Sequence, residues 1–298
     1  MSKTAILIDS TFYMSEQEIN DNNFYVVPLS VNFDNLSFSE KATDPSQMVE
    51  MFYKINESKK LPQTSQPSTN DAMAMYKQIK ADGYDRVISL HISGALSGTA
   101  QGMSMAAKQF AEENPGLEIE VYDSKLTGPF AANLAKTVAK VIQKHGDITS
   151  VEVEEIIEHY SKHTEVYLLV DKLDYLAYGG RIPATIASVG NLFGISPIIT
   201  LNELGGLERY KAERSQKKAI MTILDKLEKM EFNGGDNVLL GSFYTTEDKM
   251  AKKFLKEANK RTDANVIDSN LSQLGIVISN HVGPGAFGLY WTKRYEIK

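Results

Sequence analysis

The residues from 87 to 110 constrain the fold more than any other stretch of this 298-residue chain. They begin with a nearly continuous apolar run, which is typical of a strand covered on both faces: Val87, Ile88, Leu90 and Ile92. Small and hydroxyl residues follow, and apolar residues then recur at helical spacing: Met103, Ala106, Ala107 and Phe110. The pattern predicts a buried strand that runs into a helix beginning near Ser97 or Gly98. Open α/β sheets bind ligands at such places, because the first N–H groups of a helix lack partners within the helix.

Ser97 has two interpretations at this point. It could contact an anion, or it could simply cap the helix while Gly98 lets the chain turn. The glycines at 94, 98 and 102 are spaced by four, which matches neither G-x-G-x-x-G nor a P-loop. Ser97 also lacks the glycine two positions earlier that a nucleophile elbow needs. The local pattern alone therefore leaves both a ligand contact and a plain helix cap open, and it matches neither a nucleotide-binding loop nor a nucleophile elbow.

Strands and helices alternate along the rest of the first half, which predicts a mainly parallel sheet flanked by helices. The predicted strands lie at 4–8, 24–29, 31–33, 87–92 and 117–122, and the last helix of this half at 129–145. The second half is expected to be mixed α/β, with a hairpin at 196–212 and His281 on a Gly/Pro turn between strands. The polar segment 146–150 suggests two domains, 1–150 and 151–298, although it is also compatible with a loop inside one continuous fold.

Prolines stand at both ends of a short segment between two predicted helices, at Pro62 and Pro67. Each proline removes a backbone donor and biases the preceding residue away from helix. The segment is therefore predicted to be a rigid extended loop that carries Thr64. It is either a binding loop or a plain connector with surface hydroxyls.

Composition narrows the classes of function. The 32 Lys and Arg against 38 Asp and Glu give a formal net charge of -6, which argues against a nucleic-acid binder. The chain has no cysteine, which excludes disulfides, thiol chemistry and thiolate metal sites. No apolar run approaches ~18 residues, and the chain enters its first strand without a signal segment. We therefore expect a soluble, cytoplasmic protein.

One helix places three possible metal ligands on one face: Glu155, His159 and His163. The H-E-x-x-H arrangement of zinc proteases is missing, because no glutamate lies between the histidines in that spacing. We expect no metal site here.

Five short motifs occur along essentially the whole chain: Asp9-Ser10-Thr11, Gln63-Thr64-Ser65-Gln66-Pro67-Ser68, Leu96-Ser97-Gly98-Thr99, Tyr178-Gly179-Gly180-Arg181 and His281-Val-Gly-Pro-Gly285. Together and in this order they resemble the DegV family of bacterial fatty-acid-binding proteins, which includes the FakB carriers. The resemblance implies two α/β domains with one fatty acid in a tunnel between them, its acyl chain buried and its carboxylate at the interdomain surface.

The resemblance also implies roles for individual residues. Thr64 and Ser97 match the hydroxyls that bind the carboxylate, with the Gly98 N–H beside them, and His281 matches a histidine near the head group. Arg214 resembles, more loosely, an arginine linked to this polar network, whereas Arg181 is expected to be structural or to face a partner. Two positions depart from the family pattern, where a second serine and an aromatic residue are common: Gly94 and Ala100.

The function implied is that of a carrier with no catalysis and no cofactor of its own. It would bind a long-chain fatty acid, contact a membrane surface transiently, and present the carboxylate to a fatty acid kinase that supplies ATP and Mg²⁺. The physical balance suits this: a dozen buried methylenes contribute on the order of 10 kcal/mol, and one charge-assisted hydrogen bond ~1.5–3 kcal/mol. The alternatives are a hydrolase built on Ser97, His281 and Asp9, and a carrier of another apolar molecule.

Overall fold

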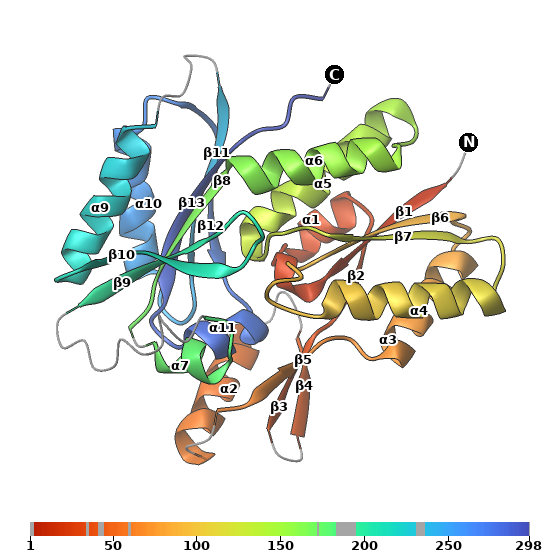
Figure 1. The fold of residues 1–298 in the computed structure, drawn as a ribbon, viewed down its shortest axis with the longest axis horizontal. Helices are drawn as coiled ribbons and strands as arrows, with labels where there is room; N and C mark the ends of the chain where they lie inside the picture. The colour runs from red at the N-terminus through yellow and green to blue at the C-terminus, as the bar shows by residue number, and fades with distance from the viewer. Residues whose placement is uncertain are drawn as a thin grey trace.

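A computed structural model describes residues 3–33, 36–40, 45–58, 61–171, 173–182, 195–230 and 236–297. Two large sheets lie side by side with helices packed on them, and a small third sheet lies beside them (Figure 1). All strands of the first large sheet and of the small sheet precede residue 150, and all strands of the second large sheet follow it. The fold is therefore mixed α/β, as predicted, and the strands of the two large sheets are separated in the chain by residues 124–163.

The first sheet is parallel, with the order β2-β1-β6-β7. Its strands are β1 (Thr4–Asp9), β2 (Phe24–Val27), β6 (Arg86–His91) and β7 (Glu118–Asp123). Alternate residues of β1 and β6 pack on opposite faces: α3 (Thr69–Ala81) and α4 (Thr99–Glu113) cover one face, and α5 (Gly128–His145) covers the other. Every residue of β6 is buried in consequence, including the polar Ser89 and His91 beside the apolar Val87, Ile88 and Leu90. A 3-10 turn (Ser10–Phe12) and α1 (Glu16–Asp21) connect β1 to β2.

The small sheet is antiparallel, with the order β4-β3-β5. Its strands are β3 (Ser30–Phe33), β4 (Leu36–Ser39) and β5 (Gln63–Ser65), and α2 (Pro45–Ser58) packs against it. The predicted rigid loop between the two prolines is thus a short strand, whose central residue Thr64 lies opposite Val31. Strand pairing holds Thr64 in place more firmly than a loop would.

The second large sheet is mixed, with the order β10-β9-β8-β13-β11-β12, and β11 and β12 are its parallel pair. Its strands are β8 (Thr164–Leu169), β9 (Ser196–Leu201), β10 (Leu207–Glu213), β11 (Asn237–Tyr244), β12 (Asn265–Gln273) and β13 (Phe287–Lys293). Helices α9 (Gln216–Glu228) and α10 (Lys249–Arg261) cover its outer face (Figure 1). Helix α6 (Ser150–His163) packs with α5 on the inner face. The predicted hairpin is present as β9 and β10.

One apolar core joins the two large sheets through α5. The ring of Phe130 on α5 packs against Tyr290 and Phe243 of the second sheet, with ring centroids 5.5 and 6.2 Å apart. Because side chains of both sheets share this core, the two halves of the chain are packed against each other rather than merely linked.

The predicted position of His281 on a turn between strands is wrong. His281 lies in the last turn of a short helix, α11 (Ile276–Val282), which follows β12. Another short helix, α7 (Asp174–Tyr178), packs against it. The N–H groups at the start of α11 bond to side chains from the first half of the chain, namely Val277 to Glu40 and Ile278 to Tyr13. These contacts between distant segments favour helix over the strand that the local apolar run suggests.

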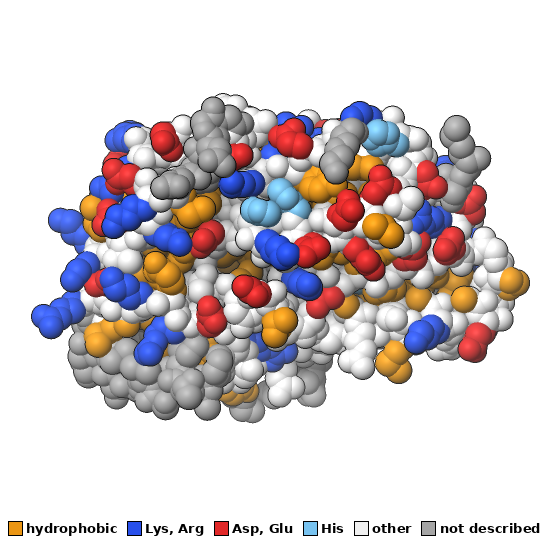
Figure 2. All heavy atoms as spheres, turned by 45° about the horizontal axis from the view of Figure 1, so that its top comes forward, with side chains coloured by type: hydrophobic (Ala, Val, Ile, Leu, Met, Phe, Trp, Pro, Cys, Tyr) orange, Lys and Arg blue, Asp and Glu red, His pale blue; other side chains and the backbone are white. Residues whose placement is uncertain are grey.

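Acidic and basic side chains are intermixed on the face shown in Figure 2, as expected for a chain of slightly negative net charge. Within the described ranges, no helix has the length and apolar character needed to cross a bilayer.

Candidate functional site

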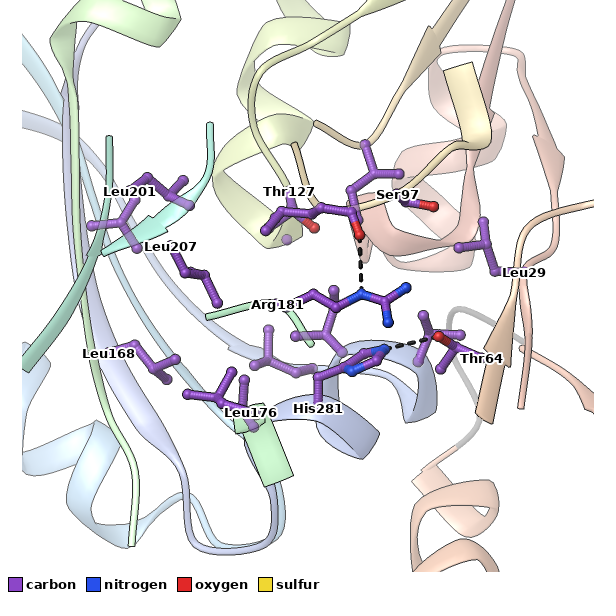
Figure 3. Close-up of a pocket in the computed structure, with 18 of the residues that line it drawn as sticks. Leu29, Thr64, Ser97, Thr127, Leu168, Leu176, Arg181, Leu201, Leu207 and His281 are labelled. Carbon is purple, nitrogen blue, oxygen red and sulfur yellow. Dashed lines mark hydrogen bonds between the residues drawn. The ribbon is translucent and has the colours of Figure 1, made fainter. Parts of the chain in front are cut away.

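A cavity of about 350 Å³ lies between the two large sheets, where α5, α7 and α11 also meet (Figure 3). Most of its wall is apolar and comes from both halves of the chain: Leu29, Ile92, Leu96, Phe130, Val166, Leu168, Leu176, Ile199, Leu201, Leu207, Phe243, Leu274, Val277, Ile278 and Val282. Its polar side chains are Thr64, Ser65, Gln66, Ser97, Thr127, Arg181, Thr200 and His281. A largely apolar cavity with a few polar groups is the usual form of a small-molecule site.

Thr64 and His281 form the centre of the polar end. Thr64 Oγ1 lies 2.8 Å from His281 Nε2, although the two residues are 217 positions apart in the chain. Strand β5 carries Thr64 and helix α11 carries His281, so the contact joins the small sheet to the second half of the chain. The resemblance of the sequence motifs predicted both residues for the head-group site, and the structure brings them together at the cavity wall.

His281 is held in its neutral form. Burial, together with the neighbouring positive charge of Arg181, lowers the pKa of His281 to about 4. Its Nδ1 atom is buried without a hydrogen-bond partner among the described residues. Gly179 faces this ring so closely that a Cβ there would lie 2.2 Å from Nδ1. The glycine of the Gly-Gly-Arg motif therefore makes room for the imidazole.

Arg181 was expected to be structural or to face a partner. In the structure its side chain lines the cavity. Its Nε donates to the carbonyl oxygen of Leu96 at 3.2 Å (Figure 3), and Nη1 donates to the carbonyl oxygen of Gly179. Among the described residues that line the cavity, Arg181 has the only side chain that is charged at neutral pH, and its hydrogen bonds to described residues go to carbonyl oxygens. The guanidinium is therefore available to attract an anion.

Ser97 and Gly98 lie in the cavity wall where α4 begins, which confirms the predicted start of this helix. Gly98 is the N-cap residue, and no side chain caps the helix. Ser97 Oγ instead contacts Thr99 Oγ1 at 2.8 Å and accepts a hydrogen bond from the Thr99 N–H at 3.3 Å. The partial positive charge of the helix start favours a negatively charged ligand.

Four further polar residues line the cavity that the sequence did not single out as binding residues, namely Ser65, Gln66, Thr127 and Thr200. The Gln66 amide packs over the start of α4, where Cβ atoms at Gly98 and Gly102 would lie 2.8 and 2.6 Å from it. Thr127 is the N-cap residue of α5, and its buried hydroxyl has no partner among the described residues. The motif at 63–68 signalled Gln66, whereas no local signal distinguished Thr127 from an ordinary helix cap.

Arg214 is not part of this cluster. It is exposed just beyond the carboxyl end of β10, and it does not line the cavity. The cavity contacts β10 at the opposite end of this seven-residue strand, through Leu207. The expectation of a head-group role therefore does not fit the position of Arg214, and the arginine that lines the cavity is Arg181. Gly94 and Ala100, the two departures from the family pattern, also lie outside the cavity lining.

The three residues of the hydrolase alternative do not form a catalytic triad. Asp9 bonds through Oδ2 to the N–H of Ile92 and contacts His91 Nδ1 at 3.2 Å, so it orients His91 and not His281. His281 contacts Thr64, and Ser97 contacts Thr99. The buried Asp9 carboxylate thus joins the ends of β1 and β6, which is a structural role.

The histidines of α6 are also engaged elsewhere. His159 Nε2 and His163 Nδ1 lie 3.0 and 2.8 Å from the carbonyl oxygens of Lys293 and His159. In the described part of the chain, no group of three or more His, Asp or Glu side chains is arranged to hold a metal ion.

Comparison with known proteins places this architecture in a family. The family model described as "Uncharacterised protein, DegV family" matches residues 3–294. The chain belongs to the DegV family. A DegV domain-containing protein of Listeria monocytogenes is 30% identical over 297 residues, covering 97% of this chain and 98% of the relative.

Two solved DegV structures are similar over nearly their whole length. A DegV protein of Streptococcus agalactiae, described as fatty acid binding, superposes with a TM-score of 0.84 at 27% identity and covers 99% of this chain and 100% of its own. A DegV family protein of Thermus thermophilus, whose description also names fatty acid binding, superposes with a TM-score of 0.83 at 27% identity. The match covers 98% of this chain and 99% of that protein. The DegV family motifs quoted above thus lie on a fold shared with these proteins.

Proposed function

We propose that this protein binds one long-chain fatty acid in the cavity, with the acyl chain against the apolar wall and the carboxylate at the polar end. The observation that carries the proposal is the composition of the cavity: leucines and other apolar side chains form most of it, and its neutral hydroxyls, imidazole and one guanidinium gather toward one side (Figure 3). The fatty-acid-binding DegV structures of similar fold support it.

The polar end suits a carboxylate that stays ionised. Transfer to an apolar site would favour the protonated acid, unless donors and positive charge stabilise the anion. Thr64, Ser97 and the start of α4 supply donors, and Arg181 supplies the charge. Neutral His281 adds either a donor or an acceptor, depending on its tautomer.

We also propose that the protein delivers the fatty acid to a fatty acid kinase in the cytoplasm, which forms the acyl phosphate with its own ATP and Mg²⁺. In this proposal the carrier needs no cofactor and performs no catalysis. Polar residues at the cavity are exposed or half-buried, including Gln66 and Ser97, so a partner has a route to the carboxylate.

The test is acyl-phosphate formation by a reconstituted kinase with the double variant Thr64→Ala, Ser97→Ala. Removing two donors to an ionised group, each contributing ~1.5–3 kcal/mol, should reduce acyl-phosphate formation at subsaturating fatty acid by tenfold or more. A matched control is Ser150→Ala, whose hydroxyl bonds to Glu120 on the surface, away from the cavity. Unchanged product formation by the double variant would contradict the head-group assignment.

A further inference from the structure

A buried carboxylate lies directly behind the cavity wall. Glu40 follows β4, and its side chain is 3% exposed. Ser10 Oγ donates to its Oε2 at 2.6 Å, and the Tyr13 hydroxyl and the Val277 N–H donate to its Oε1 at 3.2 and 2.9 Å. Glu40 therefore joins the first half of the chain to the start of α11.

Three residues of the cavity wall are bonded to this cluster. Val277 bonds to Glu40 itself, Ile278 donates its N–H to the Tyr13 hydroxyl at 3.2 Å, and Leu29 donates its N–H to Ser10 Oγ at 3.1 Å. All three wall residues line the cavity, whereas Glu40 does not. Glu40 is thus separated from the ligand space by a single layer of residues and is not a binding group.

No cation compensates the charge of Glu40 among the residues that the structure describes. The groups that face it are the hydroxyls of Ser10 and Tyr13, the Val277 N–H and, further away, the like charge of Asp9. The pKa of Glu40 is raised to about 7, chiefly by burial; its three hydrogen bonds oppose this rise, and the charge of Asp9 adds to it. Both protonation states are therefore populated near neutral pH.

We propose that Glu40 couples fatty-acid binding to the uptake of a proton, because an ionised carboxylate that enters the cavity disfavours a second ionised carboxylate behind the wall. This inference rests on the proposed binding function. Val277 and His281 are one helical turn apart, about 6 Å along the axis of α11, so the two negative charges lie near each other. At an effective dielectric of about 20, like charges roughly 10 Å apart shift a pKa by about one unit.

The sign of the effect follows from linkage. The bound anion raises the pKa of Glu40, so the complex holds more protons than the free protein and affinity rises as pH falls through 7. A shift of about one unit makes binding about tenfold tighter well below pH 7 than well above it. Near pH 7.5 about half a proton is taken up for each fatty acid bound.

The test is calorimetric titration with hexadecanoic acid below its aggregation limit at pH 7.5, in two buffers of different ionisation enthalpy. We expect the wild-type protein to take up about half a proton on binding, and Glu40→Gln to take up close to none, because its amide keeps the shape without titrating. The ionisation of the ligand and of His281 is common to both proteins, so the difference between them isolates Glu40.

Glu213→Gln is the matched control. Glu213 is also shielded, at 5% exposed, but Lys211 and Lys218 pair with it at 2.8 and 3.5 Å at the end of β10 away from the cavity. On binding the fatty acid, the Glu213→Gln variant should take up the same fraction of a proton as the wild type. Ser10→Ala removes a donor that lowers the pKa of Glu40 and should move the uptake to higher pH.

The same proton uptake in Glu40→Gln as in the wild type would overturn the inference while leaving fatty-acid binding intact. An unshifted pH profile in Ser10→Ala would also count against it. A wild-type protein that binds no fatty acid in either buffer would contradict the proposed function itself.

Discussion

The two ends of the cavity are built in different ways. Its apolar part rests largely on regular elements, with Leu168 on β8, Leu201 on β9 and Leu207 on β10. Its polar part gathers residues from short elements and the ends of elements, among them Thr64 on a three-residue strand and His281 on a seven-residue helix. If the cavity binds a fatty acid as proposed, we expect the apolar part to supply most of the affinity and the polar part to fix the position of the head group.

The largest expected effect comes from filling the apolar part. Leu207→Trp should displace about three or four methylenes of a long acyl chain, at ~0.8 kcal/mol each, which is roughly a hundredfold loss of affinity for hexadecanoic acid. A shorter acid, such as decanoic acid, should lose much less because it need not reach Leu207. Titration with both acids checks the difference, and an equal loss for both would break the distinction between the two ends.

Leu204→Trp provides the matched control for this experiment. Leu204 lies in the loop of the same hairpin, but its side chain is 73% exposed and does not line the cavity. This variant should bind both acids like the wild type.

A smaller effect is expected at the polar end. Thr64→Val keeps the size of the side chain and removes one hydroxyl, which should weaken binding by ~1.5 kcal/mol or somewhat more, about tenfold. Because the loss is confined to the head group, it should be the same for decanoic and hexadecanoic acids. A loss that grows with chain length would show that Thr64 acts through the apolar wall.

The smallest effect distinguishes the two arginines. Arg214→Ala should leave the affinity within about twofold of the wild type, since Arg214 is exposed and outside the cavity. Arg181→Ala should weaken binding several-fold and increasingly so at low salt, because it removes a charge at the cavity. Equal losses of affinity in the two variants would indicate that Arg214 also contributes to binding of the carboxylate.

Much of the scaffold is predictable from local sequence. The apolar residues within 87–92 predicted β6, and the helical spacing of apolar residues after Ser97 predicted α4. Both predictions succeed because each pattern depends only on residues within its own element. The motifs also identified Thr64, Ser97, Gly98 and His281 as cavity residues. Here local pattern and tertiary structure agree.

The remaining features depend on contacts that no local pattern encodes. The segment that begins at Ile276 is apolar enough for a strand, and it is helical where Glu40 and Tyr13 bond to its first N–H groups. Glu40 itself is one acidic residue in a polar stretch, and only the packed structure reveals that it is buried. The position of Arg214 outside the cavity likewise depends on tertiary structure, because the cavity contacts β10 at Leu207, the end of the strand away from Arg214.

The most direct test of the central claim is native mass spectrometry of the purified protein, followed by denaturation and identification of any released lipid. We predict one noncovalently bound long-chain fatty acid per chain, lost on denaturation and diminished in Leu207→Trp. A protein that carries no fatty acid and takes none up when incubated with hexadecanoic acid, or that releases a different apolar molecule, would contradict the account.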